Sequence, residues 1–212
     1  MTIWFISDTH FGHSKVMEYE ERPFASVDEM DTVMMLNWNQ KIQPEDLVYH
    51  LGDVSFHKKA RTREILKQLN GIKICVRGNH DFKPVAMMGL GFDACLEACF
   101  LRVGRHDCYV SHEPLHMSAP GTWMLHGHVH SKWKVLPFDR KICVSVENWQ
   151  YAPVSETELI SIMDKVTNPW EKDERQDEDE ESEDCERKVD PHRWNSSRST
   201  QGVLSYIAAP NP

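Results

Sequence analysis

The 212 residues of the chain are enough for one domain with a sizeable core, and a hydrophobic fraction of 40% is typical of a globular protein. The formal net charge of −9 is unevenly spread, because residues 171–188 contain eleven acidic and four basic side chains. The rest of the chain is close to neutral, which excludes a basic surface built for tight binding to duplex nucleic acid.

The cellular compartment is indicated by what the chain lacks. No uninterrupted apolar run is long enough for a transmembrane helix, and the opening residues MTIWFISDTH lack the basic region of a signal peptide. None of the six cysteines forms a C-x-x-C pair, and several lie in apolar, strand-like runs. We therefore expect a cytoplasmic protein with free thiols, no cysteine zinc site and no membrane association.

Strand-like and helix-like segments alternate over residues 1–166, which predicts a layered α/β fold. The helices are predicted from apolar residues at helical spacing, and the strands from short apolar and β-branched runs. In chain order, we predict a strand at Ile3–Ser7, a helix over 27–40, a strand at Leu47–Leu51, a helix over 58–69, and strands at Ile72–Val76, Cys108–Ser111, Trp123–His126 and Ile142–Val146.

The C-terminal part of the chain differs in composition from the rest. From about Glu171 it becomes acidic and loses its apolar periodicity. These changes predict a folded domain over residues 1–168 and an acidic, disordered tail over residues 169–212. The short apolar piece VLSYIAA leaves a second interpretation open for the last residues, which is a docked strand.

Five of the predicted strands end in side chains that can bind a metal ion or carry a proton. Each of these short blocks alone is common in proteins, but all five occur in one chain at successive strand ends. In α/β sheets, ligands bind beyond the carboxyl ends of the strands, so we expect the blocks to meet. They are Asp8-Thr9-His10, Gly52-Asp53, Gly78-Asn79-His80-Asp81, His112-Glu113-Pro114 and Gly127-His128-Val129-His130.

The chemistry of these side chains points to transition metals. Mixed imidazole and carboxylate ligands suit first-row divalent ions, whereas calcium and magnesium prefer oxygen alone. The set exceeds one tetrahedral site, so we expect two ions, about 3.5–4 Å apart as in other two-metal hydrolases. Manganese is our first choice, with zinc, iron or nickel as alternatives. Gly52, Gly78 and Gly127 each lie beside a ligand, where the chain must turn sharply or let backbone approach.

The order of the blocks, D-x-H, G-D, G-N-H-D, H and G-H-x-H, resembles that of the calcineurin-like metallophosphoesterase superfamily. The blocks span residues 8–130, most of the predicted domain. The sequence segments FISDTHFGH, RPF and VYHLGDVSF are most similar to those of small, uncharacterised bacterial and phage members of this superfamily. The resemblance implies an αββα fold, in which a two-sheet β-sandwich is flanked by helices and carries a dinuclear metal site at its edge.

The resemblance also implies a role for each side chain. His80 is similar to the family's catalytic histidine, which does not bind metal, and Asp81 would orient it. His126 matches no ligand position, so we expect it either to be structural or to support a neighbouring ligand. The implied metal ligands are Asp8, His10 and His130 for the first ion, Asn79, His112 and His128 for the second, and Asp53 for both.

The implied reaction is hydrolysis of phosphodiester bonds in small or nucleotide-like substrates. A hydroxide bridging the two metals would be the nucleophile, and His80 would protonate the leaving group as general acid. His13 and Arg22 are candidates for contacts to the phosphate, although a loop arginine can also be a solvated surface side chain.

Other functions stay open from the sequence. A phosphomonoesterase would use the same ligands, and a nuclease for short single-stranded or cyclic substrates is compatible with the charge. A catalytically inactive protein-binding scaffold is the alternative from another class, and the complete ligand set argues against it. A protein phosphatase is disfavoured, because the second block continues Val54-Ser55-Phe56-His57 instead of the longer G-D-x-V-D-R-G pattern.

Overall fold

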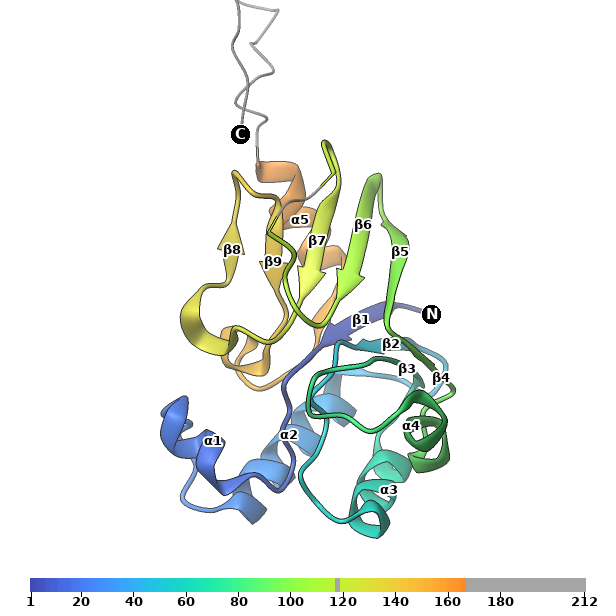
Figure 1. The fold of residues 1–212 in the computed structure, drawn as a ribbon, viewed down its shortest axis with the longest axis vertical. Coiled ribbons are helices and arrows are strands. Elements are labelled where there is room, and N and C mark those ends of the chain that lie inside the picture. Colours follow the sequence, from blue (N-terminus) through green and yellow to red (C-terminus); the bar gives the residue numbers. More distant parts are fainter. Residues whose placement is uncertain (117–118, 167–212) are drawn as a thin grey trace, which may run out of the picture. The chain divides into compact units, whose positions relative to one another are not determined.

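The body of the domain consists of two five-stranded sheets (Figure 1). The structure is a computed structural model, and it describes residues 1–116 and 119–166. The predicted acidic tail over residues 169–212, including the VLSYIAA piece, lies outside the described residues. Within the described ranges, every helix is too short or too polar to cross a lipid bilayer.

The first sheet has the strand order β10-β1-β2-β3-β4. Strands β1 to β4 run parallel, and β10 pairs with β1 in the antiparallel direction. Because β1, β2 and β3 are parallel neighbours, the residues that follow them emerge at one edge. The bounds are β1 Ile3–Ile6, β2 Leu47–His50, β3 Ile72–Val76, β4 Ala94–Leu96 and β10 Val154–Ser155.

Helices cover one face of the first sheet (Figure 1). Ser26 starts the longest of them by accepting a hydrogen bond from the backbone N–H of Glu29, as an N-cap serine does. Trp38 and Ile65 from two of these helices pack with Val48 of β2 in one buried cluster. The helices are α1 Ser14–Tyr19, α2 Val27–Lys41, α3 Lys59–Gln68 and α4 Pro84–Leu90.

The second sheet has the strand order β5-β6-β7-β9-β8. Its central strands β6, β7 and β9 are parallel, and the outer strands β5 and β8 pair antiparallel. The bounds are β5 Ala98–Val103, β6 His106–Ser111, β7 Trp123–His126, β8 Val135–Leu136 and β9 Lys141–Cys143. Two 3₁₀ turns, η1 His130–Lys132 and η2 Val146–Trp149, and a helix, α5 Glu156–Lys165, complete the described fold.

A second apolar cluster joins the two sheets. Phe5 and Val76 of the first sheet pack in it with Val110 and Leu125 of the second, and Leu159 of α5 also belongs to it. Neighbouring residues of β1 thus serve different cores, because successive strand side chains point to opposite faces. The α/β fold with two sheets and several helices, predicted from the sequence, is therefore confirmed.

The predicted elements agree with the structure except at one strand, and seven further helices and strands have no prediction. Five strands and both helices are placed to within two residues, but the sixth strand ends at Cys143 rather than Val146. There Ser145 forms a parallel bridge with Ser7, and Val146 begins η2. The elements without a prediction are α1, α4, α5, β4, β5, β8 and β10. Of these, β4, β8 and β10 have only two or three residues, which is too few to show a periodicity.

The bridge between Ser7 and Ser145 fixes where the two sheets meet. The backbone N–H of Ser7 donates to the carbonyl of Val144 at 3.0 Å, and that of Val146 donates to Ser7 at 3.2 Å. These bonds hold the carboxyl end of β1 against the carboxyl end of β9. The polar residues that follow the strands of both sheets therefore lie along one seam.

Candidate metal centre

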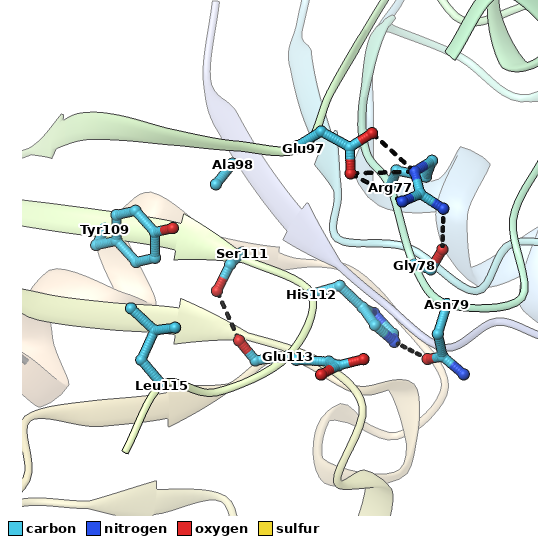
Figure 2. A pocket seen from close by; sticks show the side chains of 10 residues that line it. All are labelled: Arg77, Gly78, Asn79, Glu97, Ala98, Tyr109, Ser111, His112, Glu113 and Leu115. Carbon is cyan, nitrogen blue, oxygen red and sulfur yellow. Dashed lines mark hydrogen bonds and ion pairs between the residues drawn. The ribbon is translucent and has the colours of Figure 1, made fainter. Parts of the chain in front are cut away.

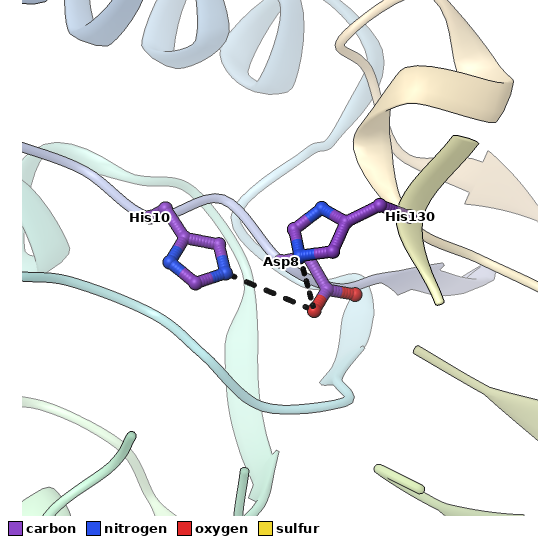
Figure 3. A group of neighbouring side chains, drawn as sticks. All are labelled: Asp8, His10 and His130. Carbon is purple, nitrogen blue, oxygen red and sulfur yellow. Dashed lines mark ion pairs between the residues drawn. The ribbon is translucent and has the colours of Figure 1, made fainter. Parts of the chain in front are cut away.

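Asp8, His10 and His130 form a first group of candidate metal ligands, whose donor atoms all lie within 4.8 Å of one another (Figure 3). One carboxylate oxygen of Asp8 lies 3.9 Å from Nε2 of His10 and 3.7 Å from Nε2 of His130. The other oxygen accepts hydrogen bonds from the hydroxyls of Ser7 and Ser145, both at 2.6 Å. The serine hydroxyls thus hold one carboxylate oxygen, and the oxygen that faces both imidazoles accepts a hydrogen bond of 3.1 Å from the backbone N–H of His128.

Asn79, His112 and His128 form the second group. The side-chain oxygen of Asn79 lies 2.8 Å from Nε2 of His112 and 3.1 Å from Nδ1 of His128. The other ring nitrogen of His112, Nδ1, lies 2.7 Å from the carbonyl oxygen of Leu51 and must donate its proton there. This bond directs Nε2 of His112 towards the seam. Metal-binding histidines usually donate their other ring N–H in this way, which fixes the orientation of the ring.

Asp53 lies between the two groups. Its Oδ2 is 3.5 Å from Nε2 of His10 in the first group and 3.5 Å from Nε2 of His112 in the second. Its Oδ1 accepts a hydrogen bond of 2.9 Å from the backbone N–H of His80. One carboxylate oxygen therefore faces ligands of both groups, which is the geometry that a bridging ligand needs.

Backbone strain is concentrated at the candidate ligands. Nine non-glycine residues of the described chain have a positive φ, and five of them are candidate ligands. This left-handed conformation is uncommon for residues with a side chain, and it clusters at functional sites. The five are Asp8 (57°), His10 (49°), Asp53 (58°), His128 (70°) and His130 (52°).

Close backbone approach at the ligands confirms the prediction made for the neighbouring glycines. A Cβ atom at Gly127 would lie 2.5 Å from the carboxylate Oδ2 of Asp8 and 2.5 Å from the hydroxyl of Ser7. Gly52 has a φ of +87°, and a Cβ atom added there would overlap the backbone nitrogen of Gly78. Any side chain at these two positions would push a candidate ligand out of place.

The electrostatics of the buried groups fit divalent metal ions. Burial lowers the pKa of His10 to about 3, so its imidazole is neutral, and both ring nitrogens are buried without a hydrogen-bond partner among the described residues. Burial alone would raise the pKa of Asp53, but hydrogen bonding and charge from His112 hold it below its usual range. A neutral imidazole with a free lone pair beside a carboxylate is a donor set for a first-row transition metal.

His80 lies at the mouth of this centre. Its imidazole is exposed, with its ring centre 6.0 Å from that of His10 and 5.2 Å from that of Phe56. No hydrogen bond holds its ring within the described part of the chain, so either ring nitrogen is free to serve a substrate. The predicted catalytic histidine thus lies beside the first ligand group.

The contacts of Asp81 differ from those that the resemblance implies. Its carboxylate accepts hydrogen bonds from the backbone N–H groups of Asp53 (2.8 Å), Val54 (3.0 Å) and Gly78 (2.9 Å), rather than from His80. Three backbone donors point at this carboxylate, so its oxygens are already engaged. Asp81 therefore holds the Asp53 turn in place, and we correct the prediction that it orients the catalytic imidazole.

The two expected substrate contacts lie in different surroundings. His13 is at the edge of the centre, where its ring stacks on Phe56 with ring centres 4.0 Å apart and lies 5.5 Å from the ring of His10. Arg22 is buried, with no exposed side-chain area, and pairs with Glu147 at 2.6 Å. A buried and paired guanidinium faces the protein rather than solvent, so we correct the expectation that Arg22 reaches a substrate.

His126 and Glu147 lie near the ligand groups but belong to neither of them. His126 is fully buried at the end of β7, with its ring against Trp133 at 4.5 Å, and belongs to neither ligand group. Glu147, absent from the predictions, lies 3.0 Å from Nδ1 of His130. It follows the sixth predicted strand, so the strand-end rule that found the other residues would also have found Glu147.

A pocket of about 350 Å³ adjoins the second ligand group. Figure 2 shows Asn79 and His112 at one end of it and Tyr109 and Leu115 at the other. The remaining side chains are mostly polar, and the ion pair between Arg77 and Glu97 lies on its rim (2.9 Å). Its lining residues are Arg77, Gly78, Asn79, Glu97, Ala98, Tyr109, Ser111, His112, Glu113 and Leu115.

Comparison with known proteins identifies the family. The family model described as calcineurin-like phosphoesterase matches residues 1–150, and the chain belongs to this family. The uncharacterised protein MJ1445 of Methanocaldococcus jannaschii is 33% identical over 175 residues, covering 77% of this chain and 92% of the relative. The gene 66 protein of Mycobacterium phage D29 is 28% identical over 183 residues, covering 69% and 88%.

A solved structure supports the same fold. A protein of unknown function from Aquifex aeolicus, AQ665, superposes with a TM-score of 0.62 and 28% sequence identity, covering 76% of this chain and 98% of that chain. The family assignment makes the protein a metal-dependent phosphoesterase. Its grouped histidines and aspartates are candidates to hold the divalent ions that the family uses.

Replacing Asp81 by alanine should destabilise the metal-free protein. Three backbone N–H groups would lose a charged acceptor, and we expect a loss of about 3 kcal/mol in the free energy of unfolding, measured by urea denaturation. Asp107→Ala, at a side chain that is 71% exposed, is the control and should change the stability by less than about 0.5 kcal/mol. Equal effects of the two changes would contradict the role assigned to Asp81.

Metal binding should release protons near neutral pH. Burial alone would lower the pKa of His112, but the carboxylates of Asp53 and Asp8 outweigh it and raise the pKa to about 9. The metal-free imidazole is therefore charged at pH 7, and a proton must leave before Nε2 can bind a metal. Affinity for Mn²⁺ should rise between pH 7 and 9, by about tenfold per pH unit for each proton displaced. Calorimetry in buffers of different ionisation enthalpy measures the release, and a value of zero would contradict this prediction.

Proposed function

We propose that the protein is a phosphodiesterase for small or nucleotide-like substrates. The observation that carries the proposal is a pocket beside one ligand group together with an exposed aromatic ring beside the other. On one side lies the pocket that begins at Asn79 and His112, and on the other the exposed ring of Phe56 lies between those of His13 and His80. A diester has two organic substituents on its phosphorus, whereas a monoester has one.

The charge of the pocket supports an uncharged group at that end of the substrate. Arg77 is the cation of its lining, and three hydrogen bonds of 2.9 to 3.1 Å already engage its guanidinium with the carboxylate of Glu97. Glu113 adds a further carboxylate on the exposed side. A second phosphate would meet this negative charge, so we expect a sugar, nucleoside or aromatic alcohol rather than a phosphorylated group.

We assign the metals to the ligand groups that the geometry forms. Asp8, His10 and His130 would hold one ion, Asn79, His112 and His128 the other, and Asp53 both. Divalent ions at these positions supply a water of lowered pKa and neutralise charge on the phosphoryl oxygens. The mixture of carboxylate, amide and imidazole donors favours Mn²⁺, with Zn²⁺, Fe²⁺ and Ni²⁺ as alternatives.

The protein's own contribution to the chemical step is the imidazole of His80. It is exposed at the mouth of the centre, and its backbone N–H is fixed on the carboxylate of Asp53 (2.9 Å). We propose that its ring donates a proton to the leaving oxygen, because an exposed imidazole beside the centre can act as a general acid.

Filling the pocket should separate diesters from monoesters. Ala98 lies on β5 and lines the pocket, so Ala98→Phe should raise the KM for bis(4-nitrophenyl) phosphate by about tenfold and leave kcat/KM for 4-nitrophenyl phosphate within about twofold. Val85→Phe, at a 78% exposed position of α4, is the matched control and should change neither. A wild-type preference for the monoester, or equal effects on both esters, would rule out the diesterase proposal.

Replacing His80 by alanine should slow turnover without removing metal. Loss of a general acid typically costs 10²- to 10⁴-fold, so we expect kcat to fall within about that range while two Mn²⁺ ions still bind by calorimetry. His106→Ala is the control, because this histidine lies at the opposite end of β6 from His112. Loss of a metal ion in His80→Ala would show that His80 is a ligand instead.

A further inference from the structure

A buried ion pair lies behind the first ligand group. Oε1 of Glu147 accepts hydrogen bonds from Nη2 (2.6 Å) and Nε (3.0 Å) of Arg22, and it lies 3.0 Å from Nδ1 of His130. The side chains of Arg22 and Glu147 are 0% and 4% exposed. One carboxylate oxygen thus receives the guanidinium and the imidazole at the same time.

This contact determines which nitrogen of His130 can face a metal. A carboxylate acceptor on Nδ1 keeps the proton on that atom, so the lone pair of the neutral ring is on Nε2. Nε2 is the atom that lies 3.7 Å from Oδ1 of Asp8. Asn148 supports the same residue by donating from Nδ2 to the carbonyl of His130 at 2.7 Å.

The guanidinium of Arg22 also holds the backbone of the strained turn that carries the other two ligands. Nη2 donates to the carbonyl oxygen of Asp8 at 2.7 Å, and Nη1 donates to that of Thr9 at 2.9 Å. Asp8 and His10 both have a positive φ, so this turn needs such support. Arg22 and Glu147 together contact the turn and the third ligand, which come from different sheets.

Stability alone does not account for this pair. A buried ion pair is expensive to desolvate, and apolar side chains of similar size usually stabilise a protein as well or better. We propose that Arg22 and Glu147 are positioning residues, which preorganise Asp8, His10 and His130 to bind one metal ion. The proposal rests on the metal assignment given above, and it does not depend on which ester is cleaved.

Glu147 could instead be a ligand itself, because it lies close enough to Glu20 and His130 to share a cation with them. Two contacts argue against this alternative. Arg22 already supplies the positive charge that Glu147 needs, and Oε2 of Glu20 accepts hydrogen bonds from the backbone N–H (3.3 Å) and the hydroxyl (2.7 Å) of Ser131. The structure therefore favours an arginine-held acceptor over a third metal site.

The test compares two changes of the pair. The double variant Arg22→Met/Glu147→Leu removes both charges together and so avoids an unpaired buried ion, which a single deletion would leave. Glu147→Gln keeps a side-chain oxygen that can still accept from Nδ1 of His130. The matched control is Asp164→Asn, because Asp164 also joins an arginine and a histidine, Arg105 at 2.9 Å and His106 at 2.8 Å, but does so at the surface.

Calorimetric titration of metal-stripped protein with Mn²⁺ gives the dissociation constants. We expect the double variant to weaken one of the two sites by 10- to 100-fold and to change the other by less than about threefold. Glu147→Gln should lose less affinity at the same site, and Asp164→Asn should match the wild type. Thermal denaturation of the metal-free proteins should show a folded double variant.

Several results would overturn the proposal. Unchanged affinities at both sites in a folded double variant would show that the pair does not position a ligand. Equal weakening of both sites together with a large fall in the metal-free melting temperature would show a general structural role. His130→Ala distinguishes these failures from an error in the metal assignment, because it should abolish one Mn²⁺ site, and retention of both sites would refute the assignment itself.

Discussion

The carboxylate of Asp53 lies between the two groups of candidate ligands and connects them. Oδ2 of Asp53 lies 3.5 Å from an imidazole nitrogen of each ligand group, so neither group can shift without changing its distance to the shared oxygen. The groups themselves draw on both sheets, since His112 follows β6 and His10 follows β1. Joining the carboxyl ends of the sheets, through the bridge between Ser7 and Ser145, is therefore a condition for the centre to exist.

Much of this arrangement could be predicted because it follows from a general rule of parallel sheets. Residues after parallel strands emerge at one edge, so five polar blocks at strand ends predict one site without any knowledge of the loops. The rule does not depend on the exact end of a strand, and small errors at Ser7 or Leu51 left the ligands in place. The strand-end rule therefore predicts which residues lie at the candidate centre, but it does not predict the hydrogen bonds that they form.

The supporting roles of Arg22 and Asp81 could not be predicted in the same way. Arg22 lies between a short helix and a proline, where nothing in the local sequence distinguishes a buried arginine from a solvated one. Its burial depends on Glu147, which is 125 positions away in the chain. The resemblance similarly pairs the carboxylate of Asp81 with its sequence neighbour, His80, whereas its partners are the backbone N–H groups of Asp53 and Gly78. Long-range pairs of this kind are set by the packed fold rather than by a local pattern.

The strain at the ligands explains why such support is needed. Five candidate ligands in the left-handed region, at about 1 kcal/mol each, would cost about 5 kcal/mol, which is comparable to the whole net stability of a small domain. Three sets of contacts resist relaxation of these turns: Asp81 on the Asp53 turn, Arg22 on the Asp8 turn, and Asn148 on His130. Because a bound ion stabilises only the conformation that binds it, metal binding would further stabilise these turns in the left-handed conformation. The supporting contacts favour the same backbone conformation that bound metals would favour, and the two large apolar clusters supply the stability that this conformation requires.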